Sequence, residues 1–91
     1  MGIRAMTRIL RTYRLRYNLI TVSEIIMRWA PPNENDTPAY IDFVADQIMV
    51  GADDHLTFED YYGLVKAIIK FENGEQPYDN AVVREGVELG I

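Results

Sequence analysis

Apolar side chains recur every three or four residues through most of this sequence, and capping motifs or prolines interrupt them at intervals. Such spacing places the apolar groups on one stripe of an α-helix. No stretch shows the alternation of apolar and polar residues that indicates a half-buried strand. We therefore expect an all-α fold, a compact bundle of about five short helices.

The first two expected helices are amphipathic. The first spans residues 3 to 18, with an apolar stripe of Ile3, Met6, Ile9, Leu10, Tyr13 and Tyr17 opposite a basic face of Arg4, Arg8 and Arg11. The second begins at the capping-box spacing from Thr21 to Glu24, where two side chains can satisfy free backbone amides. Pro31 and Pro32 end it, because proline has no amide hydrogen to donate. Its buried stripe should be Val22, Ile25, Ile26 and Trp29.

Three further helices are expected in the rest of the chain. Thr37 and Pro38 predict the N-cap and first residue of a helix that runs to Met49. Its core residues should be Ile41, Val44, Ala45 and Ile48, flanked by Tyr40 and Phe43. A helix from the capping pattern at Thr57 to Asn73 is apolar almost all round and belongs at the centre. The last helix should run from about Asp79 to Leu89.

The size and composition of the chain restrict its class. A chain of 91 residues is too short for two independent cores, so residues 1–91 are expected to form a single domain. Its 48% hydrophobic content excludes disorder, and the absence of cysteine excludes disulfides and thiolate metal sites. No apolar run reaches the roughly 20 residues that span a bilayer, and no secretion signal begins the sequence. We expect no membrane partner.

Charge is distributed unevenly along the chain. The first twenty residues contain five arginines and no acid, so they carry +5 while the remainder carries −10. Such asymmetry can mark a nucleic-acid-binding arm. Because no second basic cluster and no aromatic stacking platform accompanies it, we instead expect the basic helix to face acidic parts of its own fold or of a partner. Nucleic acid is not the expected partner.

Few residues suggest catalysis. His55, the one histidine, lies beside Asp53 and Asp54 and could bind a metal or act as a base, but a lone exposed histidine usually does neither. There is no glycine-rich phosphate loop, HExxH motif or EF-hand spacing, and a Ser or Cys triad has no support. We expect no metal and no cofactor.

Two segments are richer in polar and aromatic residues than a connection requires. The first, from Arg28 to Thr37, combines an aromatic ring, amides and acids, which suits sugar binding. It could equally be a proline-stiffened turn with Trp29 in the core. The second follows the buried helix, where Glu72 could donate a proton, cap backbone amides or pair with Arg28. The candidate ligand-binding residues are Arg28, Trp29, Asn33, Glu34, Asn35, Thr37, Tyr40, Asn73 and Tyr78, and the candidate catalytic acids are Glu34 and Glu72.

At these two segments the sequence resembles a family of small phage and prophage structural proteins whose helical part looks like lysozyme. The matching words are GIRAM at residues 2–6, residues 21–26, RWAPPNENDT at 28–37, AYI at 39–41, ENG at 72–74 and QPY at 76–78. They cover almost the whole chain. Family members carry an additional N-terminal segment with an NNNPGNI-like motif, which this sequence lacks. In peptidoglycan-cleaving enzymes with a similar helical core, the catalytic Glu lies upstream of the matching loop, so the resemblance implies that this acid is missing.

The resemblance implies a virion-associated structural protein of a phage or prophage, located in the bacterial cytoplasm or the virion. It would act by interaction with another copy or another virion protein, and would not be catalytic alone. The alternative is a peptidoglycan-binding or lysozyme- or transglycosylase-like module that binds a glycan strand. Cleavage needs a protonated carboxylic acid with a second carboxylate or a positioned water opposite it, and Glu34, Asp36 and Glu72 could supply one half of that arrangement.

Overall fold

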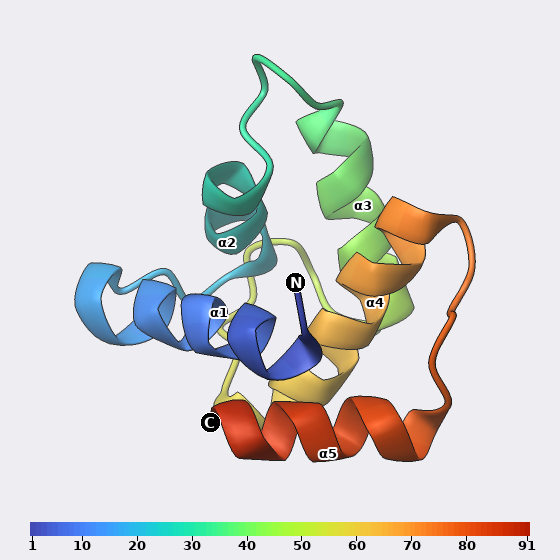
Figure 1. The fold of residues 1–91 in the computed structure, drawn as a ribbon. Helices are drawn as coiled ribbons and strands as arrows, with labels where there is room; N and C mark the ends of the chain where they lie inside the picture. Colours follow the sequence, from blue (N-terminus) through green and yellow to red (C-terminus); the bar gives the residue numbers. More distant parts are fainter.

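The computed structural model describes residues 1–91 and is all-helical, as predicted (Figure 1). Its elements are α1 (Ile3–Tyr17), α2 (Val22–Trp29), α3 (Thr37–Gln47), a 3-10 turn η1 (Phe58–Asp60), α4 (Tyr61–Asn73) and α5 (Asn80–Gly90). No helix is both long enough and apolar enough to cross a bilayer.

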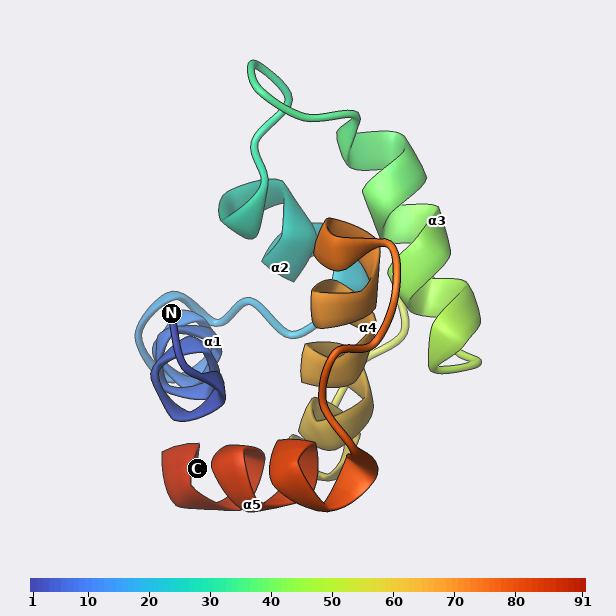
Figure 2. The same ribbon diagram turned by 45° about the vertical axis from the view of Figure 1, so that its right-hand side comes forward.

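Helix α4 lies at the centre of the bundle, as its apolar sequence predicts. It contacts α1, α3 and α5, while α2 packs on α3 and α1 packs on α5 (Figures 1 and 2). Six of its thirteen residues are buried: Tyr61, Leu64, Val65, Ala67, Ile68 and Ile69. A helix surrounded on several sides keeps only a narrow polar face, which explains its largely apolar composition.

The helix ends follow the local signals in the sequence. The capping box is formed, with the Thr21 hydroxyl accepting from the amide of Glu24 and the Glu24 carboxylate accepting from the amide of Thr21. The carboxylate also accepts from the Ile20 amide, and these backbone bonds lower the pKa of Glu24. Helices α1 and α4 end at left-handed residues, Asn18 and Gly74.

Three predictions of burial and helix length need correction. Tyr17 was expected in the apolar stripe of α1 but is 48% exposed, and the Arg28 guanidinium covers its ring at 4.2 Å. Tyr40 was expected at the flank of α3 but is 2% exposed, because its ring packs against Phe71 of α4. Helix α3 ends at Gln47, two residues early, and Met49 takes a left-handed conformation.

The contact between α1 and α5 depends on two glycines. A Cβ added at Gly86 would lie 2.6 Å from the Ile3 side chain, and one added at Gly90 would lie 2.6 Å from Thr7. Because position 86 faces position 3 and position 90 faces position 7, the two helices run in the same direction. Their backbones therefore approach closely. The buried Thr7 hydroxyl donates a hydrogen bond within α1, to the carbonyl of Ile3 at 2.8 Å.

Candidate ligand-binding site

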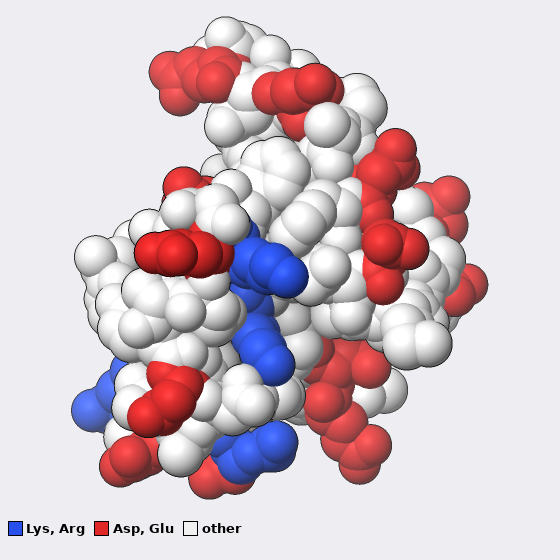
Figure 3. Space-filling model, turned by 90° about the vertical axis from the view of Figure 1, so that its right-hand side faces the viewer, with Lys and Arg blue, Asp and Glu red and all other residues white.

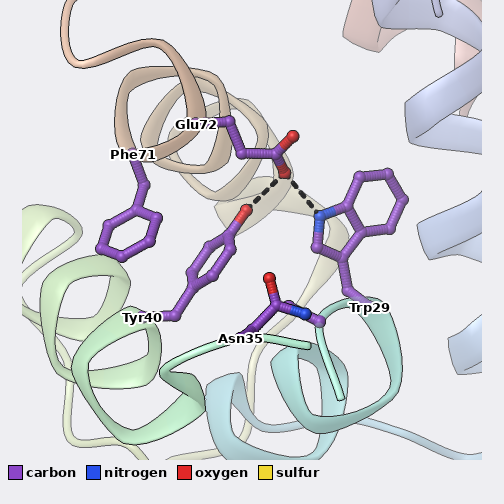
Figure 4. Close-up of a pocket in the computed structure, with 6 residues that line it drawn as sticks. Trp29, Asn35, Tyr40, Phe71 and Glu72 are labelled. Atoms are coloured by element: carbon purple, nitrogen blue, oxygen red, sulfur yellow. Dashed lines mark hydrogen bonds between the residues drawn. The ribbon is translucent and has the colours of Figure 1, made fainter. Parts of the chain in front are cut away.

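Two aromatic side chains from two helices meet at one carboxylate oxygen of a third helix (Figure 4). Trp29, at the end of α2, donates its indole N–H to Glu72 Oε2 at 2.9 Å. Tyr40, in the first turns of α3, donates its hydroxyl to the same oxygen at 2.6 Å. Glu72 stands in the last turn of α4, so this oxygen joins the ends of three helices.

Aromatic packing holds Tyr40 in this position. Its ring stacks on Phe71 with the centroids 4.1 Å apart, and Phe71 also contacts Phe43 at 5.2 Å. Burial, with the hydrogen bond to Glu72 and the negative charge there, raises the pKa of Tyr40 above its usual range. The phenol therefore stays protonated and remains a donor at neutral pH.

The loop between α2 and α3 is closed by side-chain hydrogen bonds. Asp36 is the N-cap of α3 and accepts from the amide of Ala39, which corrects the prediction that Thr37 has this role. Thr37 is instead buried within the helix start, where its hydroxyl donates to the carbonyl of Ala30 at 2.6 Å. Because the Asp36 carboxylate caps the helix, the Thr37 hydroxyl is available to link the two ends of the loop.

A hollow of about 510 Å³ opens beside the shared carboxylate. Its lining residues are Trp29, Ala30, Asn35, Tyr40, Phe71 and Glu72. The Asn35 amide nitrogen donates to the carbonyl of Pro31 at 3.1 Å, and its oxygen points toward the space between Tyr40 and Trp29 (Figure 4). Aromatic faces and polar acceptors therefore share one concave surface, as in many small-ligand sites.

A second hollow, of about 270 Å³, has Trp29 and Glu72 in its wall as well. It is lined by Met1, Ile3, Met6, Trp29, Ile69, Glu72, Asn73 and Tyr78, and is more apolar. The two hollows share the hydrogen-bonded pair of Trp29 and Glu72. A ligand longer than one hollow could contact both.

The structure brings together six of the candidate residues. Trp29, Asn35, Tyr40 and Glu72 line the larger hollow, and Asn73 and Tyr78 join Trp29 and Glu72 at the smaller one. Asn33 and Glu34 are exposed and line neither. Glu72 caps no backbone amide and does not pair with Arg28, whose guanidinium lies over the rings of Tyr17 and Tyr13.

Several lining residues were not among the sequence candidates. Phe71 and Ala30 border the larger hollow, and Met1, Ile3, Met6 and Ile69 border the smaller one. The periodicity that assigns apolar residues to a core gives no sign that some of them also face a hollow. For Phe71, its position beside Glu72 was the one available signal.

The carboxylates do not form an acid pair. Glu72 is the one carboxylate in the wall of either hollow, whereas glycoside cleavage needs an acid with a second carboxylate or a positioned water opposite it. Glu34 lies in the loop and its backbone amide donates to the carbonyl of Pro31. No three His, Asp or Glu side chains are grouped to hold a metal ion, and His55 is exposed.

Surface charge on one side of the molecule is mixed. Figure 3 shows Lys and Arg in a short band with Asp and Glu on either side, and acidic groups at the upper end, where the loop between α2 and α3 lies. Asp42 and Asp46 on α3 are exposed. This side offers no continuous positive surface to a phosphate backbone.

Comparison with known proteins relates the chain to a phage protein. No protein-family model matches it. It is 45% identical over 90 residues to Protein P5 of Pseudoalteromonas phage PM2, and the match covers 99% of this chain and 56% of the phage protein. The chain thus spans little more than half the length of that relative. The phage connection predicted from the sequence motifs is confirmed.

Proposed function

We propose that this chain is a virion-associated structural protein of a phage or prophage, which acts by protein interaction and is not catalytic alone. The observation that carries the proposal is an apolar surface on α5 and the residues before it, where Tyr78, Val82 and Leu89 are exposed. Exposed apolar side chains gathered on one surface usually mark an interface. The resemblance to phage structural proteins and the similarity to Protein P5 support a phage context.

The expected lack of catalysis rests on the carboxylates. Glycoside cleavage needs an acid and, across the bond, a second carboxylate or a held water. Glu72 is the one carboxylate that lines either hollow beside Trp29. Glu34 lines neither hollow, so no second carboxylate stands across a hollow from Glu72.

The test is whether particles contain the chain. Particles produced by the phage or prophage that carries the gene would be purified on a density gradient and analysed by mass spectrometry. We expect the chain in the particle fraction, and the variant Leu89→Asp to be lost from it while Glu75→Ala is retained. A chain found in the soluble lysate and absent from particles contradicts the proposal.

A second candidate function is binding of a peptidoglycan glycan strand, the role implied by a lysozyme-like helical core. The observation that favours it is the larger hollow, where Trp29 and Tyr40 offer aromatic surface and Asn35 and Glu72 offer acceptors for sugar hydroxyls. Oε1 of Glu72 takes part in neither hydrogen bond to Trp29 or Tyr40 and is available to a ligand.

Titration with soluble peptidoglycan fragments tests this role, because Trp29 is the single tryptophan and reports directly on the hollow. We expect its fluorescence to change, and Asn35→Ala to weaken binding. Asn33→Ala is the matched control, since Asn33 lies in the same loop but outside both hollows. Reducing ends released in parallel would contradict the non-catalytic proposal. No response in either assay removes the glycan role.

A further inference from the structure

A further shallow hollow, which shares Ile3 and Tyr78 with the smaller hollow beside Trp29, lies between the start of α1 and the outer side of α5. It has a volume of about 370 Å³ and is lined by Gly2, Ile3, Arg4, Tyr78, Val82, Glu85, Gly86 and Leu89. On α5 the lining positions 82, 85, 86 and 89 follow helical spacing, so they form one continuous stripe. We call this stripe, together with the start of α1, the α5 face.

The α5 face exposes large apolar side chains to water. Val82 is 46% and Leu89 is 56% exposed, and they stand two turns apart at opposite ends of the stripe. Between them lies Gly86, whose missing side chain leaves room for Ile3 of α1.

The two charged residues of the face have opposite signs and belong to different helices. Arg4 is on α1 and Glu85 is on α5, and both side chains are exposed. A line from Arg4 to Glu85 therefore runs across the stripe, while a line from Val82 to Leu89 runs along it. The face carries its positive charge on one side and its negative charge on the other.

We propose that the α5 face binds the α5 face of a second copy of this chain, with a twofold axis passing near Gly86. This rests on the proposed function as an interaction protein and names the partner. A rotation of 180° about that axis brings one end of each line opposite the other end of the same line in the partner. Val82 therefore meets Leu89 of the partner subunit. Arg4 meets Glu85 of the partner subunit, and the reverse pair forms as well. The same surface is complementary to itself, as a twofold interface requires.

Charge decides between this occupant and others. A nucleic acid would be repelled by Glu85 in the stripe, and a purely apolar partner would leave both charges of the face desolvated and unpaired. A copy of the same face pairs both charges and covers both apolar ends. Opposite charges at such positions set the orientation of the partners more than they add affinity.

Sedimentation velocity of the 91-residue chain over a range of concentrations tests the proposal. We expect a monomer–dimer equilibrium. Arg4→Glu and Glu85→Arg should each weaken dimerisation about tenfold or more, because each puts two like-charge pairs in the interface. The double variant Arg4→Glu/Glu85→Arg restores opposite pairs and should recover the dimer. Met49→Asp, at a fully separate exposed site, should dimerise like the wild type.

A wild-type chain that stays monomeric at every concentration overturns the dimer, as does a double variant no better than the single ones. Circular dichroism of each variant separates weakened association from lost structure. A monomeric chain that is still found in purified particles would leave the structural role intact and refute this partner alone. A dimeric chain absent from particles would support this partner and contradict the structural role in the virion.

Discussion

Tyr40 and Glu72 are 32 residues apart in the sequence, yet the Tyr40 hydroxyl donates a 2.6 Å hydrogen bond to the Glu72 carboxylate. The bond joins the start of α3 to the end of α4. Because the Tyr40 ring is buried and its partner is charged, this hydrogen bond should stabilise the fold as well as the hollow beside it.

Removal of this hydroxyl should destabilise the protein. We expect Tyr40→Phe to lower the free energy of unfolding by about 1–2 kcal/mol, because a hydrogen bond to a charged acceptor is lost while the ring packing remains. Urea denaturation measures this. Tyr78→Phe, at an exposed ring, is the control and should unfold like the wild type. Equal stabilities for the two variants would show that the bond contributes nothing.

Loss of the Glu72 carboxylate should change the environment of Trp29. In Glu72→Ala the indole N–H loses its acceptor and the ring becomes more exposed, so we expect its fluorescence emission to move to longer wavelength. Glu75→Ala, three residues along and outside both hollows, should leave the emission unchanged. Since the chain has a single tryptophan, the signal needs no assignment.

Stability should fall in alkaline solution. Burial raises the pKa of Tyr40 and of Tyr61 in the folded protein, whereas an unfolded tyrosine ionises near pH 10. Above that pH the unfolded chain loses protons that the folded chain keeps, so the stability is present below about pH 10 and is lost as the pH rises further. Urea denaturation between pH 7 and pH 11 checks this.

The two tyrosines can be separated by substitution. Tyr40→Phe should reduce the slope of unfolding free energy against pH above pH 10, by at most about 1.4 kcal/mol per pH unit. Tyr61→Phe should reduce it as well. A slope that neither substitution changes would assign the alkaline loss to other groups.

The close contact of α1 and α5 should not tolerate a side chain at position 90. A Cβ there would lie 2.6 Å from Thr7 Cβ and 2.9 Å from the Arg4 carbonyl oxygen, so the helices must separate. We expect Gly90→Ala to cost about 1–3 kcal/mol of unfolding free energy, more than the better helix propensity of alanine returns. Thermal unfolding measures this, with Gly2→Ala as the control, since a Cβ there meets nothing within 4 Å. An unchanged melting temperature for Gly90→Ala would mean that the end of α5 simply frays.

The helices and most of their ends could be predicted from the sequence. Caps such as Thr21 with Glu24, and terminators such as Gly74, act over four residues or fewer, so the sequence specifies them directly. The burial of α4 also follows from its own composition. Where two neighbouring residues compete for one role, as Asp36 and Thr37 do at the start of α3, the local signal was misassigned by one position.

The Trp29 site and the α5 face depend on the tertiary structure. The sequence indicated that Trp29, Tyr40 and Glu72 were candidates, but their meeting joins residues 32 and 43 positions apart and depends on how three helix ends pack. The glycine contact of α1 with α5 likewise depends on two helices at opposite ends of the chain. Periodicity states which side of a helix is apolar, but not which other helix covers it or how closely. Close packing decides this, because the side chains of neighbouring helices must interdigitate without voids or overlap.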